Sequence, residues 1–393
     1  MSTALIGVGI IGCGTISEVY LTNLTTRFNH LKVVACADID MDKARAAQEK
    51  FGLPKAATVE ELLADPEVQI VVNLTIPAAH HEINMKAMKA GKNVYCEKPL
   101  AMTLADANEE VAFAEQNSLL LGSAPDTFLG AGLQTCRKLI DEKAIGELVG
   151  FTANLMSPGH DLWHPAPVFY YKKGAGPMMD MGPYYITALV SLLGPIDRLA
   201  CFAKTARSQR EIQGEMVDVE VYTHYAGMME FASGVMGNVN MSFDVWKSKL
   251  PGIEIYGTEG TLYVPDPNMF GGPVHIFKSA GLVDRIKTTC NTPVERIMTL
   301  SGPASDEYLT EVELAFPAED TPRSNMRGMG VADMAQSLRT GRKSRLSGAL
   351  SAHVVEALTA FDTSAESGLV YKMTTTCERP QPMAGGLALW QLD

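Results

Sequence analysis

Short apolar runs alternate with amphipathic stretches over the first 125 residues. Helical periodicity between the runs predicts helices at 15–28, 41–52, 79–91 and 103–117. The β-branched apolar runs themselves predict strands at 4–11, 32–38, 68–75, 93–99 and 118–124. Strands that alternate with helices at this spacing predict an α/β fold with a parallel, doubly wound sheet of the Rossmann type.

This alternation is lost from about residue 126 onward. Several strand-like runs with Gly-bearing turns follow between 150 and 265, and they predict a large, mainly antiparallel sheet. Two late helices are expected, at 325–341 and 348–368. We therefore predict a dinucleotide-binding domain at 1–125, a substrate-binding and oligomerisation domain at 126–375, and a C-terminal tail at 376–393 whose Trp390 docks on a neighbouring surface.

The stretch GVGIIGCGTIS at 7–17 allows two registers for a dinucleotide-binding turn. Gly7 as the first glycine would leave almost no strand before the turn. Gly12 as the first glycine leaves a full strand before it and an amphipathic helix after it, so we choose this register. Ser17 then replaces the third glycine, and the two earlier glycines have no explanation.

In this register Gly12 makes the tight turn and Gly14 lets the backbone approach a pyrophosphate. The amides of Thr15 and Ile16 face that anion at the helix N-terminus. Asp38 ends the second predicted strand, at a suitable distance to accept hydrogen bonds from a ribose 2′-hydroxyl. Its charge repels a 2′-phosphate, so we expect NAD rather than NADP; the alternative is that Asp38 only starts a turn.

Charge and cysteine content exclude several classes of function. The formal net charge of -12 argues against binding to nucleic acid or to an anionic membrane. We find no stretch that would span a bilayer and no signal peptide, and the seven cysteines are scattered without a C-x-x-C pair. We therefore expect a cytoplasmic protein without disulfides or structural zinc.

Three motifs of the first domain, IIGCGTIS, TIPAAHHE and CEKPLA, occur in order, and GAGPMMDMGPYY and EIYGTEGTLYVP follow in the second. Together they resemble the glucose-fructose oxidoreductase/inositol dehydrogenase/MocA (Gfo/Idh/MocA) family over nearly the whole chain. The resemblance implies a Rossmann domain, a second domain on an open, mainly antiparallel sheet, and pairing into homo-oligomers (dimers or tetramers). It also implies oxidation of a secondary hydroxyl, or reduction of a ketone, on a small carbohydrate-like molecule.

Lys98, in CEKP, follows a strand at the carboxyl edge of the parallel sheet, where ligands bind in this architecture. By itself it reads as a solvated lysine in a turn. With the resemblance it becomes the first catalytic candidate and a cofactor contact, provided that burial lowers its pKa towards neutrality. Glu97 would orient Lys98 or contact the cofactor, and Pro99 would fix the turn.

The motif DMGPYY supplies the second group of candidates. If Asp180 opens a helical turn, Asp180 and Tyr184 project on one side of it. Many family members have histidine at the position of Tyr184, so the acid/base assignment between Lys98 and Tyr184 stays open. We expect Tyr184 to donate a proton or anchor a hydroxyl, Asp180 to bind a substrate hydroxyl, and Tyr185 to pack in the core.

The motif TIPAAHH lies at the end of a buried strand. Thr75 and Pro77 resemble positions that line the cofactor riboses, and His80 resembles a family histidine at the start of the next helix. His81 could replace it. A capping or solvated histidine is the alternative for each.

The loop SPGHDLWHPAPVFYY at 157–171 is rich in aromatic residues and proline. Trp163 and His164 stand where many members have Trp-Arg, so we expect them, with Asp126, to line the substrate pocket. His160 and His164 form an H-x-x-x-H pair, but the prolines argue against a helix, and we predict no metal site.

These features lead to an NAD-dependent dehydrogenase that acts on a sugar, cyclitol or glycoside-like substrate. Two alternatives remain open from the sequence: a glycosidase that uses tightly held NAD for transient oxidation, and a non-catalytic dinucleotide-binding regulator. The motifs do not identify the substrate or the hydroxyl that reacts.

Overall fold

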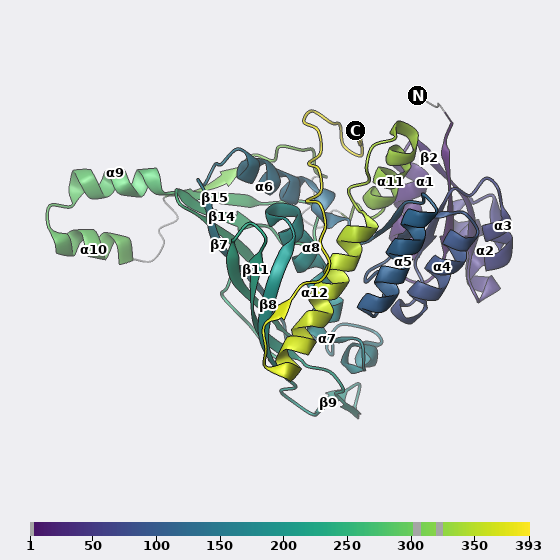
Figure 1. Cartoon of the computed structure of the whole chain (residues 1–393), viewed down its shortest axis with the longest axis horizontal. Helices are drawn as coiled ribbons and strands as arrows, with labels where there is room; N and C mark the ends of the chain where they lie inside the picture. The colour runs from purple at the N-terminus through teal and green to yellow at the C-terminus, as the bar shows by residue number, and fades with distance from the viewer. Residues whose placement is uncertain (1–3, 302–307, 320–324) are drawn as a thin grey trace.

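The computed structural model describes residues 4–301, 308–319 and 325–393. The remaining parts of the two predicted domains, 1–3, 302–307 and 320–324, lie outside the described residues. Two sheets dominate the molecule, with helix α12 between them (Figure 1).

The first sheet has the order β3-β2-β1-β4-β5-β6, and all neighbouring strands are parallel. Its strands are β1 (Ile6–Ile11), β2 (Leu31–Ala37), β3 (Lys55–Ala57), β4 (Ile70–Asn73), β5 (Asn93–Cys96) and β6 (Leu121–Ser123). The helices are α1 (Ser17–Thr26), α2 (Met41–Phe51), α3 (Val59–Ala64), α4 (His80–Lys89) and α5 (Leu104–Gln116). The predicted parallel sheet is confirmed.

The pattern of apolar and polar residues did not predict two short elements in this half. The β3 strand and the α3 helix were not predicted because three and six residues are too few to show a period. Helix α3 is instead defined by a capping box, in which Thr58 and Glu61 exchange side-chain and backbone hydrogen bonds. Helices α2 and α5 agree with the predicted ranges 41–52 and 103–117: Gly52 is the C-cap of α2, and Thr103 is the N-cap of α5, where its side chain accepts a hydrogen bond from the Asp106 amide.

The two glycines left unexplained by the sequence are required by close packing of β1. A Cβ on Gly7 would lie 1.8 Å from the carbonyl oxygen of Glu67. A Cβ on Gly9 would lie 2.8 Å from the Leu62 side chain. Both glycines therefore let the segment before β4 cross close to the middle strand, and neither belongs to the dinucleotide turn.

The second sheet has the order β16-β15-β14-β13-β7-β12-β11-β8-β17. Every pair is antiparallel except β7 with β12, so the predicted mainly antiparallel sheet is confirmed. Its strands are β7 (Leu148–Met156), β8 (Ile196–Lys204), β11 (His224–Phe231), β12 (Met236–Ser242), β13 (Ile253–Gly257), β14 (Gly260–Val264), β15 (Val274–Lys278), β16 (Leu309–Val312) and β17 (Tyr371–Lys372). A separate hairpin joins β9 (Gln209–Ile212) and β10 (Glu215–Asp218).

The helices of the second half are α6 (Ala131–Asp141), α7 (Gly176–Asp180), α8 (Gly182–Leu193), α9 (Ser279–Thr289), α10 (Pro293–Ser301), α11 (Met329–Thr340) and α12 (Gly348–Ser367). Of these, α6, α7 and α12 pack on strands of the second sheet, and α11 packs on β5 of the first. Helix α12 packs on α8 and β8 and also on α5 and β6, so it ties the two sheets together. Helices α6, α9 and α10 were not predicted; α9 and α10 project away from the body (Figure 1).

The C-terminal tail lies back on the first domain. The Trp390 ring packs edge-on against Phe28, with the ring centroids 5.5 Å apart, and Arg27 lies over the same indole. The Asp393 carboxylate pairs with Arg345 at 2.7 Å. The predicted docking of Trp390 is confirmed, and the surface that receives it is the end of α1.

Candidate active site

Lys98 follows β5 and reaches a carboxylate from the other half of the chain. Its Nζ donates to the backbone oxygen of Asp180 at 2.6 Å and to Asp180 Oδ1 at 2.9 Å. Asp180 is the last residue of α7. The ion pair therefore joins the carboxyl edge of the parallel sheet to the helices of the second domain, the place where this architecture binds ligands.

The charge state of Lys98 differs from the expectation. Burial opposes the positive charge, but the Asp180 carboxylate outweighs it, so the pKa of Lys98 is raised above its usual value rather than lowered. For Asp180, burial is likewise outweighed by Lys98 and His160, which lower the pKa of its carboxyl to about 2. Both groups are charged at neutral pH, and Lys98 begins as a proton donor.

Tyr184 lies beside this pair. The Lys98 Nζ is 5.2 Å from the centroid of its ring, a cation–π arrangement. Arg327, which the sequence did not single out, donates from Nη2 to the Tyr184 Oη at 3.1 Å and to Asn268 Oδ1 at 2.9 Å. Only the fold brings Arg327 to this hydroxyl, across 143 residues of chain.

The DMGPYY motif spans the end of α7 and the start of α8. Asp180 does not open a helical turn: α7 already begins at Gly176 and ends at Asp180, and α8 begins at Gly182. Lys98 nevertheless meets both Asp180 and Tyr184, so the two side chains share one site. Tyr185 is buried, and its hydroxyl donates to the Asn154 backbone oxygen at 3.3 Å, in agreement with a core role.

His160 completes the surroundings of Asp180. Its Nε2 lies 2.9 Å from Asp180 Oδ2, the oxygen that Lys98 leaves free. His164 has another partner, because its Nδ1 accepts a hydrogen bond from the Ala166 amide at 3.0 Å. The two histidines of the H-x-x-x-H pair thus serve different parts of the loop, and His160 was missed as a site residue.

The loop 157–171 is anchored from a distant hairpin. Arg210, on β9, is buried and donates to Asp161 Oδ2 at 2.7 Å and to the Pro158 backbone oxygen at 3.0 Å. It also donates to Asp244 Oδ1 at 2.6 Å, at the end of β12. Trp163, predicted to line the substrate pocket, is 65% exposed at the outer side of this loop.

The glycine turn has the geometry of the chosen register. Gly12 has a φ of +100°, and a Cβ there would meet the Leu74 carbonyl group at 2.7 Å. A Cβ on Gly14 would meet nothing within 4 Å, so the backbone is open to a ligand at this point. Thr15 and Ile16 continue into α1, and Ser17 closes the turn by donating from Oγ to the Gly14 oxygen at 2.7 Å.

Asp38 lies beside this turn and shapes it. Its Oδ2 accepts a hydrogen bond from the Cys13 amide at 2.7 Å, and its Oδ1 accepts one from the Asp40 amide at 2.9 Å. Asp38 therefore does start a turn, and it also places a half-exposed carboxylate beside the glycine loop. An open backbone at Gly14 with an adjacent carboxylate fits the pyrophosphate and the adenosine ribose of a dinucleotide.

The TIPAAHH and CEKP segments are fastened to each other. His80 is fully buried, and its ring nitrogens lie 2.7 Å from the Pro99 oxygen and 3.1 Å from the Thr75 oxygen. Its ring therefore fixes the CEKP turn and has no nitrogen left for a cofactor, which differs from the predicted contact. Thr75 is half-exposed and Pro77 exposed at the end of β4.

Glu97 and Asp126 are both turned inward. Glu97 accepts hydrogen bonds from the Tyr20 hydroxyl at 2.8 Å and from the Lys98 amide at 3.0 Å, so it orients the turn that carries Lys98. Asp126 is 1% exposed, and its Oδ2 accepts from the Gly328 and Gly330 amides at the start of α11. The prediction that Asp126 lines the substrate pocket is wrong: it holds α11 in place, and burial raises its pKa to about 6.

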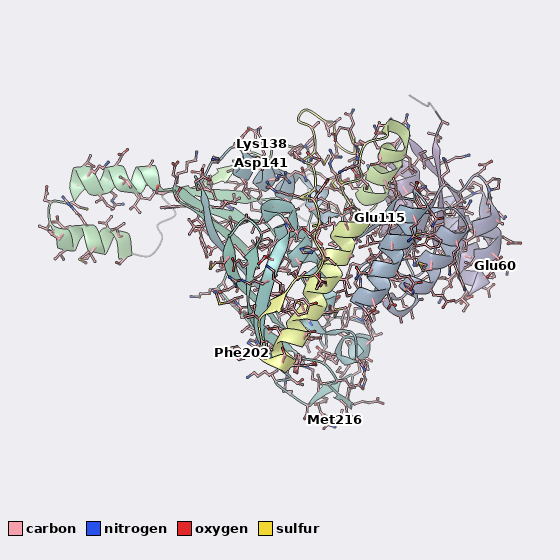
Figure 2. All side chains as sticks on the ribbon, viewed as in Figure 1. Glu60, Glu115, Lys138, Asp141, Phe202 and Met216 are labelled. Carbon is pink, nitrogen blue, oxygen red and sulfur yellow. The ribbon has the colours of Figure 1, made fainter. Side chains whose placement is uncertain are left out.

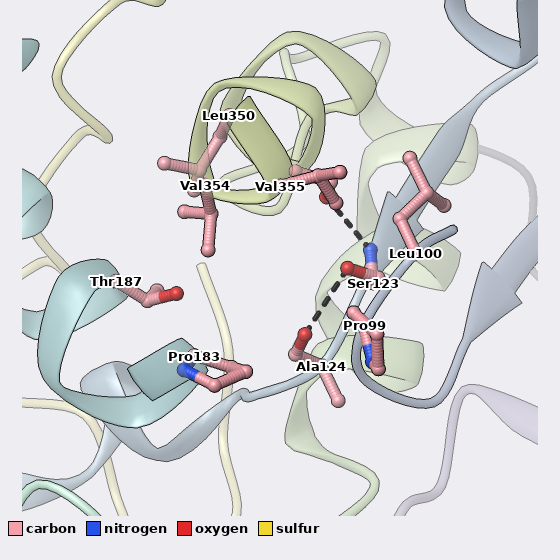
Figure 3. A pocket seen from close by; sticks show the side chains of 10 residues that line it. Pro99, Leu100, Ser123, Ala124, Pro183, Thr187, Leu350, Val354 and Val355 are labelled. Atoms are coloured by element: carbon pink, nitrogen blue, oxygen red, sulfur yellow. Dashed lines mark hydrogen bonds between the residues drawn. The ribbon is translucent and has the colours of Figure 1, made fainter. Parts of the chain in front are cut away.

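Directly behind the turn lies an apolar pocket where the two halves meet (Figure 3). Pro99 and Pro183, the neighbours of Lys98 and Tyr184, both border it, opposite Val354 and Val355 of α12. Across this junction the Ser351 hydroxyl oxygen accepts a hydrogen bond from the Ser123 amide at 3.1 Å. The lining lacks charged groups, so this pocket supports the site from behind and does not contain the reacting side chains.

Comparisons with known proteins agree with this arrangement. Residues 6–124 match the family model "Oxidoreductase family, NAD-binding Rossmann fold", and residues 133–263 match the GFO/IDH/MocA C-terminal domain. A separate observation concerns membranes: no helix among the described residues, 4–301, 308–319 and 325–393, is long and apolar enough to cross one.

Among curated relatives, 1,5-anhydro-D-fructose reductase of Ensifer adhaerens is 29% identical over 260 residues, 65% of this chain and 74% of that protein. Trans-1,2-dihydrobenzene-1,2-diol dehydrogenase of Xenopus tropicalis is 30% identical over 181 residues, 45% of this chain and 54% of that protein. Among solved structures, levoglucosan dehydrogenase in complex with NADH and L-sorbose matches with a TM-score of 0.76 at 19% identity, covering 95% of this chain and 100% of that one. The chain therefore belongs to the Gfo/Idh/MocA family and is an NAD(P)-dependent oxidoreductase that acts on CH–OH groups.

Proposed function

We propose that this protein is an NAD-dependent dehydrogenase that transfers a hydride between the nicotinamide and a secondary hydroxyl of a sugar, cyclitol or glycoside-like substrate. The observation that carries the proposal is the Lys98–Asp180 ion pair, 2.9 Å long, at the carboxyl edge of the parallel sheet and beside Tyr184. A bound nicotinamide supplies or accepts the hydride.

The chain's own residues move the proton. In the direction of reduction, the Lys98 ammonium donates a proton to the carbonyl oxygen, and Asp180 stabilises the ammonium before transfer. In the direction of oxidation, Lys98 must first lose its proton, so the oxidation rate rises with pH. Tyr184, which is held by Arg327, anchors the substrate oxygen.

Cofactor preference rests on Asp38. A carboxylate beside the glycine loop accepts hydrogen bonds from a 2′-hydroxyl and repels a 2′-phosphate, which supports NAD over NADP. In our proposal Gly12, Gly14, Thr15 and Ile16 surround the pyrophosphate. Thr75 and Pro77 line the riboses.

The substrate class rests on the relatives and on the loop 157–171. Both curated relatives are named for ring compounds that carry neighbouring oxygens. Trp163 and Phe169 expose their rings on the loop, and such rings offer apolar surface to the face of a small cyclic molecule. We place Trp163 and His164 at the outer border of the substrate site.

A homo-oligomer is also proposed. Phe202, Met228 and Met236 are exposed on β8, β11 and β12 and lie on the face of the second sheet that is opposite α12 (Figure 2 labels Phe202). This apolar face fits a second copy of the chain, giving a dimer or tetramer. We also propose a cytoplasmic location, because the seven cysteines are free thiols, as is usual in a reducing compartment. Sedimentation of the wild type and of Phe202→Glu tests the assembly: the variant should sediment as a smaller species.

The proposed activity is tested with NAD and NADP on a panel of sugars, cyclitols, anhydrosugars, glycosides and matching ketones, with detection of the reduced cofactor by absorbance. The wild type should turn over with NAD, and Lys98→Met should lose about 10²- to 10⁴-fold in kcat/KM. Lys138→Met, on the surface of α6, is the matched control and should behave as the wild type. A fully active Lys98→Met variant would refute the proposal. Cleaved glycoside without net reduced cofactor would favour the glycosidase.

A further inference from the structure

His160 and Lys98 divide the Asp180 carboxylate between them. Lys98 Nζ lies 2.9 Å from Oδ1, and His160 Nε2 lies 2.9 Å from Oδ2. The two contacts come from separate segments of the chain, Lys98 just after β5 and His160 in the loop 157–171. Each carboxylate oxygen has its own donor, which fixes the plane of the group.

The surroundings of the imidazole determine its tautomer. His160 is 8% exposed, and its Nδ1 is buried without a hydrogen-bond partner in the part of the chain that the structure describes. An N–H at Nδ1 would be buried and unpaired, which is costly, whereas a lone pair there costs less. The Nε2 atom therefore carries a proton and donates it to the Asp180 carboxylate.

Packing and backbone contacts prevent the ring from turning. Its centroid is 4.1 Å from that of Tyr170 and 4.6 Å from that of Phe243. The His160 amide donates to the Tyr171 hydroxyl at 3.3 Å, and Arg210 donates to the same hydroxyl at 2.9 Å. The direction of the Nε2–H bond is thus set by a loop anchored to a buried arginine.

We propose that His160 is a positioning residue of the dehydrogenase: its Nε2–H holds the Asp180 carboxylate in the orientation that keeps the Lys98 ammonium at the reacting oxygen. The inference rests on the proposed function. Without the Nε2 donor, the Asp180 carboxylate is free to rotate about its last side-chain bond and to move Oδ1 away from Lys98, which then keeps only the Asp180 backbone oxygen. Loss of such an orienting hydrogen bond should lower kcat by about 10- to 100-fold, the range seen when outer partners of site ligands are removed.

Two variants separate a hydrogen-bonding role from a packing role. His160→Phe keeps an aromatic ring between Tyr170 and Phe243 but removes the donor. His160→Gln keeps an N–H donor near the Nε2 position but removes the ring. We expect His160→Phe to lose kcat about 10- to 100-fold with little change in KM, and His160→Gln to recover most of the loss. An active His160→Phe, or a His160→Gln variant as poor as His160→Phe, would overturn the inference.

A measurement that needs no turnover separates this inference from the proposed function. In protein labelled with ¹⁵N-histidine, the imidazole signal that disappears in His160→Phe is that of His160. It should show a proton on Nε2, whereas an Nδ1–H tautomer with unprotonated Nε2 would overturn the inference. NADH binding to each variant, measured by fluorescence, verifies the fold. Wild-type protein inactive on the whole panel, with the expected tautomer, would mean that the proposed function fails while the contact with Asp180 stands.

Discussion

The two sides of the active site are held in place by different kinds of contact. On the proposed cofactor side, side chains contact backbone atoms: His80 the Pro99 and Thr75 oxygens, Glu97 the Lys98 amide and Asp38 the Cys13 amide. These contacts depend mainly on the path of the chain at the edge of the parallel sheet.

On the substrate side, charged side chains bond to each other across long stretches of sequence. Arg210 meets Asp161 and Asp244, and Lys98 meets Asp180. Such contacts depend on the identity of both partners, so single substitutions change them. The comparison predicts that single substitutions disturb the proposed substrate side more readily than the proposed cofactor side.

Replacing Arg210 is expected to have the largest effect on stability. Arg210→Met removes a buried arginine and takes the main partner from the half-buried Asp161 and Asp244 carboxylates, which should cost about 3–5 kcal/mol in the free energy of unfolding. Urea denaturation measures this loss. Arg207→Met removes an exposed arginine 3.5 Å from the same Asp244 and should stay within about 0.5 kcal/mol of the wild type.

The same variant tests the separation of the two sides. NADH binding to folded Arg210→Met should stay within about twofold of the wild type, while kcat/KM should fall at least tenfold, roughly the effect of a displaced substrate loop. Equal losses in NADH affinity and in substrate turnover would show that the two sides are not held independently.

Acid should weaken the protein through a buried histidine of α12. His353 is fully buried, and its Nε2 accepts a hydrogen bond from the Ile196 amide at 2.9 Å. Because an accepting nitrogen carries no proton, the folded protein keeps the His353 ring neutral. Burial lowers its pKa from 6.5 to about 4. Below pH 6.5 the unfolded chain gains a proton that the folded chain does not gain until about pH 4. The stabilising contribution is therefore present above pH 6.5 and is lost on acidification, by about 3 kcal/mol at pH 4.

Unfolding free energies from urea titrations at several pH values measure this slope. His353→Gln should remove this part of the slope, and His275→Gln, on the half-buried surface of β15, should leave it in place. An unchanged slope in His353→Gln would mean that another group is responsible.

The glycine turn should show the smallest effects and the sharpest contrast on the cofactor side. Gly12→Ala forces a side chain into a φ of +100° and into contact with Leu74, and the backbone conformation alone costs about 1–2 kcal/mol. Gly14→Ala adds a methyl group in open space and should leave the thermal midpoint unchanged. Its NADH affinity should nevertheless fall at least about tenfold, since the backbone at Gly14 approaches the pyrophosphate. Unaltered NADH affinity in Gly14→Ala would place the cofactor elsewhere.

The sequence located residues best where they lie next to a periodic element. Gly12, Asp38 and Lys98 lie just after strands β1, β2 and β5, and parallel strands bring their carboxyl ends to one edge. It failed where a role depends on what surrounds a side chain. The sequence predicted Asp126 and His80 as site residues, but both side chains are buried, and their polar atoms contact backbone groups.

By itself, the sequence determined the parallel sheet, the mainly antiparallel sheet, the position of the dinucleotide turn and the motifs that carry the family resemblance. Each follows from local periodicity or from a few adjacent residues, which the chain displays without folding. The tertiary structure alone decided that Asp180 keeps Lys98 protonated, that His160 and Arg327 join the site, and that Arg210 anchors the loop. A charge state depends on neighbours in space, and these neighbours are brought together from distant parts of the chain only when both domains are packed.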